Sequence, residues 1–367
     1  MASKALHRLV AAVLLLTGAC ARAPASPVFH EEGYPETLSA WGLFNADGRS
    51  LALNRGVEPY DLATPLFTDY ALKLRTISLP DGEAARYDAD GAFGFPVGSI
   101  VSKTFYYPMR AGVAQQEDAR PLRDGALPLD GVRLIETRLL VRRAEGWVAI
   151  PYVWNDDQTE ATLARAGSAI PMRLARADGR EETFVYLTPD QNQCAGCHAT
   201  NATTRALSPI GLAARHLNRP ALDHAGGQLQ RLAALGLLDQ APKDAPANAD
   251  WRDTTQSLDA RARAYLDINC SHCHSDVGPA DTSGLDLRAG ATGPALGLCK
   301  SPVAAGAGSG GRPFDIAPGE PGRSIFPFRM RTTEPGAMMP ELGRALAHEE
   351  GADLIEAWIS GLKGRCA

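Results

Sequence analysis

The chain has 367 residues, a formal net charge of −5, 45% hydrophobic residues and 22% charged residues. This composition is ordinary for a globular protein, and the length allows two to three domains. The mild acidity and the lack of a basic stretch argue against a nucleic-acid partner.

The N-terminal residues indicate that the protein is exported. Lys4, His7 and Arg8 precede an apolar run, residues 9–16, that is too short to span a bilayer and is typical of a signal peptide. Small residues at 17–19 stand directly before Cys20, as at a bacterial lipoprotein cleavage site. We therefore predict a signal peptide over 1–19, a lipid anchor to the membrane at Cys20, and a periplasmic location. Ordinary cleavage after Ala23, which would remove Cys20, is the alternative.

Residues 28–190 predict a β-rich domain. Short segments rich in β-branched and aromatic residues are separated by Gly, Pro, Asp and Asn, most clearly at 95–107, 133–141, 146–154 and 183–187. Five Asp-Gly pairs between residues 47 and 131 are plausible turns. This pattern favours an antiparallel sandwich or a barrel-like sheet.

The pentapeptide Cys-x-x-Cys-His follows the β-rich region and is later repeated. The first copy comprises Cys194, Cys197 and His198, and the second comprises Cys270, Cys273 and His274. Two such cysteines can form thioethers with haem vinyl groups, and the His can bind the iron. A redox dithiol and half of a zinc site are the alternatives, but neither explains the His that follows each pair. We predict two covalently bound haem c groups.

Helical patterns surround both motifs. Leucines recur at helical spacing over 212–217 and 229–238, so 191–240 is predicted to be a first haem-binding helical segment. A linker over 241–250 follows. Ser257 is a candidate helix cap, and the helix after it leads into the second motif; an amphipathic helix near 349–362 ends the chain. Residues 251–367 are thus expected to form an all-α cytochrome c domain, giving an α+β multidomain protein.

Two cysteines are left once the haem motifs and Cys20 are set aside. Cys299 lies in a loop rich in Gly, and Cys366 is the penultimate residue. Leftover cysteines in an oxidising compartment tend to pair. We therefore predict a Cys299–Cys366 disulfide, with two free thiols as the alternative.

The sixth ligand of each iron must come from elsewhere in the chain. Met339 directly precedes Pro340, whose fixed φ stiffens the loop, and we assign Met339 to the second iron, with Met338 as the alternative and Met330 as core. The first iron has no evident sixth ligand, and an open site is one alternative. Candidates from the sequence are His216, His224, Met172, Met109 and His30. His272 is interpreted as a spacer within the second motif.

Several segments resemble known bacterial haem proteins. Residues 315–325, 339–344 and 357–359 resemble the end of many bacterial cytochrome c domains, in which the Met before Pro is the axial ligand. Residues 59–62, 64–71, 103–105 and 136–140 are similar to an uncharacterised family of bacterial dihaem c-type cytochromes with an N-terminal β-rich region. This resemblance spans nearly the whole mature chain and implies an exported haem protein, but it implies no substrate.

Electron transfer is the function that these features favour. The expected protein passes electrons between periplasmic redox partner proteins through two haems. The alternative is a haem enzyme, a peroxidase or substrate oxidase, that uses an open first haem beside the β-rich domain. A third hypothesis is a binding module whose β-rich domain captures a ligand and signals through the haem redox state.

Overall fold

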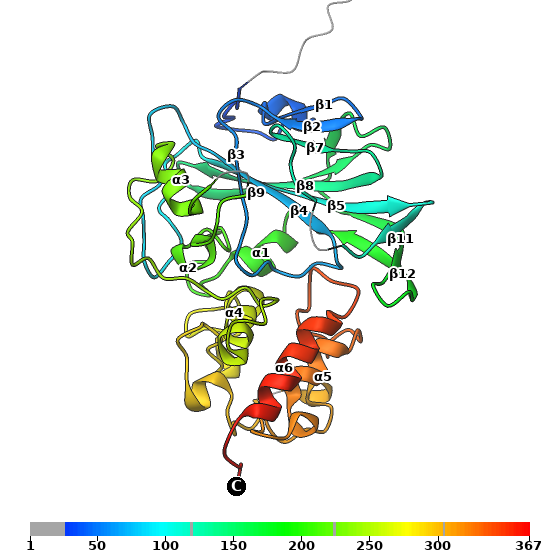
Figure 1. The fold of residues 1–367 in the computed structure, drawn as a ribbon, viewed down its shortest axis with the longest axis vertical. Helices are drawn as coiled ribbons and strands as arrows, with labels where there is room; N and C mark the ends of the chain where they lie inside the picture. Colours follow the sequence, from blue (N-terminus) through cyan, green and yellow to red (C-terminus); the bar gives the residue numbers. More distant parts are fainter. Residues whose placement is uncertain (1–25, 118–119, 223–224, 304) are drawn as a thin grey trace, which may run out of the picture.

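The computed structural model describes residues 26–117, 120–222, 225–303 and 305–367. The predicted signal peptide and Cys20 lie outside these residues, as does His224. Within the described residues, a β-rich half occupies the upper part of the molecule and a half with three helices occupies the lower part (Figure 1). No helix among the described residues is both long enough and apolar enough to cross a membrane.

A nine-stranded sheet forms the centre of the β-rich half. Strand β5 is central: it pairs with β8 along one edge and, on its other edge, with β4 near its start and β6 near its end. Across the sheet the strands are β10 (Ala161–Leu163), β9 (Gly146–Trp154), β8 (Val132–Arg143), β5 (Ile100–Arg110), β6 (Val113–Gln115), β11 (Ser168–Ala175) and β12 (Glu181–Thr188). In addition, β4 (Leu72–Ser78) pairs with β5, and β3 (Glu58–Tyr60) pairs with β4.

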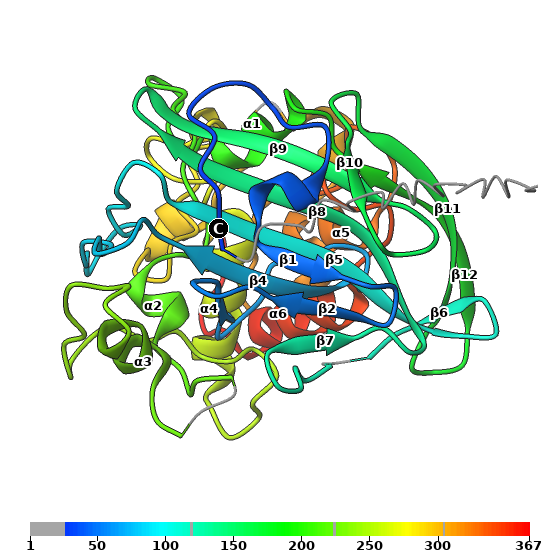
Figure 2. The same cartoon turned by 90° about the horizontal axis from the view of Figure 1, so that it is seen from above.

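A small second sheet covers one face of the large sheet. It consists of β1 (Phe44–Ala46), β2 (Ser50–Leu53) and β7 (Ala126–Pro128), and Figure 2 shows these strands lying over β4 and β5. Trp41, Leu51 and Leu127 pack there against Leu139 and Ile150 of the large sheet, all of them buried. Alternation of side chains along each strand sends the neighbouring residues to the opposite face.

Short helices cover that opposite face. They are α1 (Gln193–His198), α2 (Ala214–Leu217) and α3 (Gln228–Ala234). Val101 and Leu140 of the sheet share a buried cluster with Leu217 and Leu229 of the helices, and Cys194 belongs to the same cluster. The segment that carries the first motif is therefore packed onto the sheet and shares its core.

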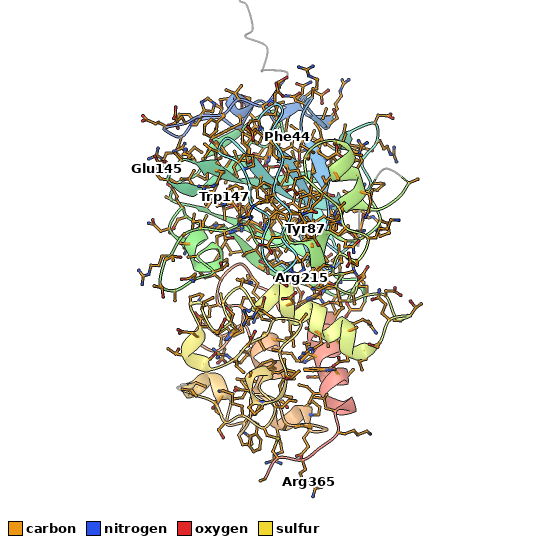
Figure 3. The ribbon with its side chains drawn as sticks, turned by 90° about the vertical axis from the view of Figure 1, so that its left-hand side faces the viewer. Phe44, Tyr87, Glu145, Trp147, Arg215 and Arg365 are labelled. Atoms are coloured by element: carbon orange, nitrogen blue, oxygen red, sulfur yellow. A yellow bond between two sulfur atoms is a disulfide. The ribbon has the colours of Figure 1, made fainter. Side chains whose placement is uncertain are left out.

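The lower half contains α4 (Leu258–Cys270), α5 (Ile325–Arg331) and α6 (Glu349–Gly361). Ser257 caps α4 as predicted, because its side chain accepts a hydrogen bond from the Ala260 backbone N–H. The buried core of the lower half includes Tyr265, Leu266, Ile355 and Trp358. Figure 3 labels Arg215 at the boundary between the two halves, where its Nε donates to Asp267 of α4 over 2.7 Å.

The predicted fold class is wrong. The molecule is mostly β, with a sheet curved like half a barrel, and the C-terminal half is not an all-α cytochrome c domain. The long segment between α4 and α5 is irregular: it holds isolated parallel bridges, such as Leu298 to Ile316, and short 3₁₀ turns. Its many Gly and Pro residues explain why helices do not form there. The 3₁₀ turns of the described chain are Leu38–Trp41, Asp281–Ser283, Gly293–Leu296, Gly306–Ser309 and Pro321–Arg323.

The predicted disulfide is confirmed. Cys299 and Cys366 are bonded, and the bond joins residues that are 67 positions apart. It fastens the C-terminal tail to the irregular segment, beside the backbone hydrogen bond from Cys299 N–H to the Ile316 carbonyl.

Candidate functional site

The first motif lies on α1, immediately after the last strand of the large sheet. Strand β12 ends at Thr188, and the Asp190 carboxylate accepts a hydrogen bond from the Gln193 backbone N–H at the start of α1. One short helix thus carries Cys194, Cys197 and His198. Cys194 points into the core shared with the sheet and is 7% exposed.

The second motif begins where α4 ends. Cys270 is the last residue of α4, and its carbonyl accepts hydrogen bonds from the backbone N–H groups of Cys273 (3.1 Å) and His274 (2.9 Å). The chain therefore continues for one more turn beyond the helix. This turn brings Cys273 and His274 back beside Cys270, which is the spacing that attachment of one haem requires.

The two motifs touch each other. The Cys273 sulfur lies 3.7 Å from the carbonyl oxygen of Gly196, which sits between the cysteines of the first motif. Leu342 closes over the same glycine, because a Cβ added to Gly196 would lie 2.9 Å from Leu342 Cδ1. Residues from three distant parts of the sequence therefore meet at one place, and no local pattern predicts this proximity.

Both motif histidines are held in the form that binds iron. His198 Nδ1 lies 2.8 Å from the Ser208 carbonyl oxygen, and His274 Nδ1 lies 3.1 Å from Ser283 Oγ. A hydrogen bond at Nδ1 fixes the tautomer and leaves the Nε2 lone pair for a metal. Burial lowers the pKa of His198 to about 3 and that of His274 to about 4, so both rings are neutral near pH 7. The donor set fits haem.

Burial raises the pKa of all four motif cysteines. It raises the pKa of Cys194 and Cys197, and it raises the pKa of Cys270 and Cys273 to about 12. A reactive dithiol has a lowered pKa, so this environment disfavours the redox-dithiol alternative and is compatible with cysteines that become thioethers.

Met339 belongs to a segment beside the second motif. Its backbone N–H donates to the Arg329 carbonyl over 2.8 Å, and the charge of Arg329 contributes, after burial, to lowering the pKa of His274. Glu341, two residues later, acts electrostatically on Cys273. The assignment of Met339 as the sixth ligand of the second iron remains a prediction.

The candidates for the sixth ligand of the first iron lie in different places. His30 packs on Trp41 under the small sheet, while Met172 and Met109 pack in a cluster with Tyr107. His216 is buried beside the carboxylate of Asp267, 3.6 Å from its oxygen. Ala214 and Leu217, which flank His216 on α2, belong to the buried cluster that holds Cys194. His272, interpreted as a spacer, carries a buried Nδ1 for which the described residues provide no hydrogen-bond partner in good geometry.

Sequence reasoning missed a row of cations beside the first motif. Arg75, Lys103 and Arg138 line one small cavity together with His198. The cavity, about 40 Å³, is smaller than a haem, so a haem at His198 requires the long side chains of this wall to move aside. Lys103 and Arg138 lie in segments that resemble the dihaem family, but their closeness depends on strand register, which no local pattern predicts.

A second, larger cavity lies between the two halves. Its volume is about 770 Å³, and Tyr60, Leu66 and Arg75 line both this cavity and the small one. Trp251 and His348 from the lower half line it as well. A solvent-accessible chamber therefore borders the neighbourhood of His198.

Comparison of the chain with protein-family models, curated proteins and solved structures found no match. The resemblance to dihaem c-type cytochromes therefore stays a prediction that rests on the residues described above.

Proposed function

We propose that this protein is an exported dihaem electron carrier. One haem c is attached at Cys194 and Cys197 with His198 as iron ligand. The other is attached at Cys270 and Cys273 with His274 and Met339 as ligands. Bound haem supplies one-electron chemistry, and the chain sets the ligands and the surroundings. The proposal includes periplasmic redox partner proteins and a lipid anchor at Cys20.

The contact between the two motifs supports this function best. The Cys273 sulfur, an attachment point of the second haem, lies 3.7 Å from the carbonyl oxygen of Gly196, which stands between the two attachment cysteines of the first haem. The two haems are therefore attached to neighbouring segments. Two neighbouring redox groups in one folded unit suit electron passage better than two separate sites do. The hydrogen bonds at His198 Nδ1 and His274 Nδ1 orient the two ligating rings, which stabilises the iron in both redox states.

Electron passage between the haems is tested with a one-electron donor added below one equivalent. In the wild type, reduction should redistribute between two spectrally distinct haems within the dead time of mixing. The double variant Cys270→Ala/Cys273→Ala should keep the first haem and lose that redistribution. Two haems that are reduced independently, with no exchange between them, would contradict the carrier function.

A haem enzyme is the second candidate, and the 770 Å³ cavity favours it. That cavity shares a wall with the surroundings of His198, so a small substrate could reach the first haem from the boundary between the two halves. Carbon monoxide distinguishes the two functions. Rapid binding to the reduced first haem supports the enzyme, whereas no binding at either haem supports the carrier.

A further inference from the structure

The large cavity between the two halves is separate from the residues that would attach haem. Its wall is built by residues between 60 and 75 of the β-rich half and by residues of 251–261 and 348–357 of the lower half. The structure describes all the motif cysteines and histidines and Met339, and none of them lines this cavity. Its volume, about 770 Å³, lies in the range of about 300–1,000 Å³ that is typical of small-molecule sites.

Aromatic rings form one wall of the cavity. The His348 ring is stacked on the Phe67 ring with centroids 4.2 Å apart, and the Trp251 ring meets His348 at a steep angle, with centroids 5.0 Å apart. All three residues line the cavity. Burial lowers the pKa of His348, so this ring adds no charge to the wall near pH 7. Such a wall favours a flat, aromatic ligand, which can pack against the rings by offset or edge-to-face contacts.

Hydrogen bonds across the boundary between the halves hold this wall in place. The Phe67 backbone N–H donates to Asn269 Oδ1 over 2.9 Å, and the Tyr70 hydroxyl donates to Glu350 Oε2 over 2.8 Å. Phe67, Tyr70 and Glu350 all line the cavity. A wall that is already fixed lowers the ordering cost of binding a ligand.

Lys73 brings a positive charge without a counter-charge to the same cavity. Its Nζ donates to the Ala71 carbonyl oxygen over 3.0 Å and lies 5.7 Å from the centroid of the Phe105 ring. No carboxylate of the described residues forms an ion pair with Lys73. The carboxylates that line the cavity pair with arginines instead: Asp61 with Arg75, Glu117 with Arg120, Glu350 with Arg176, and Asp353 with Arg331.

The surroundings of Lys73 indicate that an anion fits beside it. Burial, followed by the charges of Arg75 and Lys103, lowers the pKa of Lys73. The folded chain therefore holds the Lys73 ammonium at a cost, because a buried charge is unfavourable unless an opposite charge accompanies it. A carboxylate at Nζ would favour the ammonium and accept a charge-assisted hydrogen bond from it.

We propose that the cavity between the two halves binds a small aromatic carboxylate, with its ring against Phe67 and Trp251 and its carboxylate at Lys73 Nζ. This inference goes beyond the proposed function, because binding requires no electron transfer and no contact with a motif residue. One cation in an otherwise largely apolar and aromatic cavity orients the ligand, and the rings supply its contact area.

The test is titration calorimetry on the holoprotein with 2-naphthoate as the probe and 2-naphthalenemethanol as its neutral counterpart. The wild type should bind one 2-naphthoate per chain and should bind the alcohol at least about tenfold more weakly, because the alcohol lacks the charge-assisted hydrogen bond. Lys73→Met should lose at least about tenfold in affinity for 2-naphthoate and keep its affinity for the alcohol. Lys363→Met, which removes an exposed charge near the C-terminus, should bind both probes like the wild type.

The outcomes separate this site from the proposed function. A folded wild type that carries both haems and binds no 2-naphthoate overturns the site, as does equal affinity for the two probes or an unchanged affinity for 2-naphthoate in Lys73→Met. Intact mass reports haem attachment. A chain without haem that binds 2-naphthoate in a Lys73-dependent way keeps the site and overturns the carrier function.

A second variant covers the case in which Lys73→Met does not fold. Lys73→Gln is also neutral, but its amide can still donate to the Ala71 carbonyl oxygen. The readout is the ratio of the affinities for 2-naphthoate and the alcohol, which a general weakening of the site would not change. This ratio should fall at least about tenfold in Lys73→Gln, and a wild-type ratio would overturn the proposal.

Discussion

Asp69 joins the β-rich half to the segment that follows Met339, and its removal should destabilise the protein strongly. One oxygen, Oδ1, accepts hydrogen bonds of 2.8 Å from the backbone N–H groups of both Ala345 and Leu346. Asp69→Ala leaves two largely buried donors without an acceptor, at about 1–3 kcal/mol each. At pH 4, where the Asp69 carboxyl is neutral, the expected loss is about 2–6 kcal/mol, a large share of a typical stability of about 5–15 kcal/mol.

Asp69→Asn is the matched control. The amide oxygen can take the place of Oδ1 and accept both hydrogen bonds, while the charge is removed. Denaturant unfolding at pH 4, followed by tryptophan fluorescence, should therefore place Asp69→Ala well below the wild type and Asp69→Asn close to it. Equal stability of the two variants would refute the role assigned to the shared acceptor oxygen.

The pH dependence gives an independent check on Asp69. Burial raises the pKa of this carboxyl from 3.8 to about 6, despite the hydrogen bonds from Leu346 and Ala345. A raised pKa in the folded state means that the stabilising contribution is complete below pH 4 and is lost as pH rises to about 6. At 1.36 kcal/mol per pKa unit, the loss is about 3 kcal/mol. Asp69→Asn should lack this decline, so its advantage over the wild type should grow between pH 4 and 6.

Three further predictions concern the second motif and the disulfide. Met339→Ala should abolish the weak red band of sulfur-to-iron charge transfer in the oxidised protein, whereas Met338→Ala should keep it; survival of the band in Met339→Ala with normal haem content excludes Met339 as ligand. Ser283→Ala removes the oxygen that lies 3.1 Å from His274 Nδ1, which makes the ring a weaker donor to iron. The midpoint potential of the second haem should then rise by roughly 20–60 mV, the equivalent of one hydrogen bond of about 0.5–1.5 kcal/mol, and an unchanged potential speaks against this contact. Cys299→Ser/Cys366→Ser opens a 67-residue loop and should cost about 4 kcal/mol in the chain-entropy model; equal unfolding midpoints for this variant and the oxidised wild type would contradict it.

Local patterns in the sequence were enough for the elements close to the motifs. The Cys-x-x-Cys-His spacing predicts both attachment sites, and this prediction awaits its test. Ser257 marked the start of α4 because capping depends on residues within one turn. The Cys299–Cys366 disulfide was predictable from the cysteine count. Only these two cysteines are left once Cys20 and the four motif cysteines are set aside. The strands at 133–141 and 146–154 were visible because β-branched and aromatic residues are dense there.

Features that depend on three-dimensional register were not visible. Arg75 and Arg138 are far apart in the chain and become neighbours only through Lys103 between them in the sheet. The contact of Cys273 with Gly196 depends on how the two halves dock, which no local pattern encodes. The all-α prediction for residues 251–367 was wrong. The helical patterns of α4 and α6 were clear, but the chain between them is largely irregular.

The most direct test of the account is the intact mass of the protein after maturation in a host that attaches haem c, measured under denaturing conditions. The account predicts the polypeptide plus two haems, one fewer in Cys194→Ala/Cys197→Ala, and one fewer in Cys270→Ala/Cys273→Ala. A wild-type mass equal to that of the bare polypeptide, or one that either double variant leaves unchanged, would contradict it.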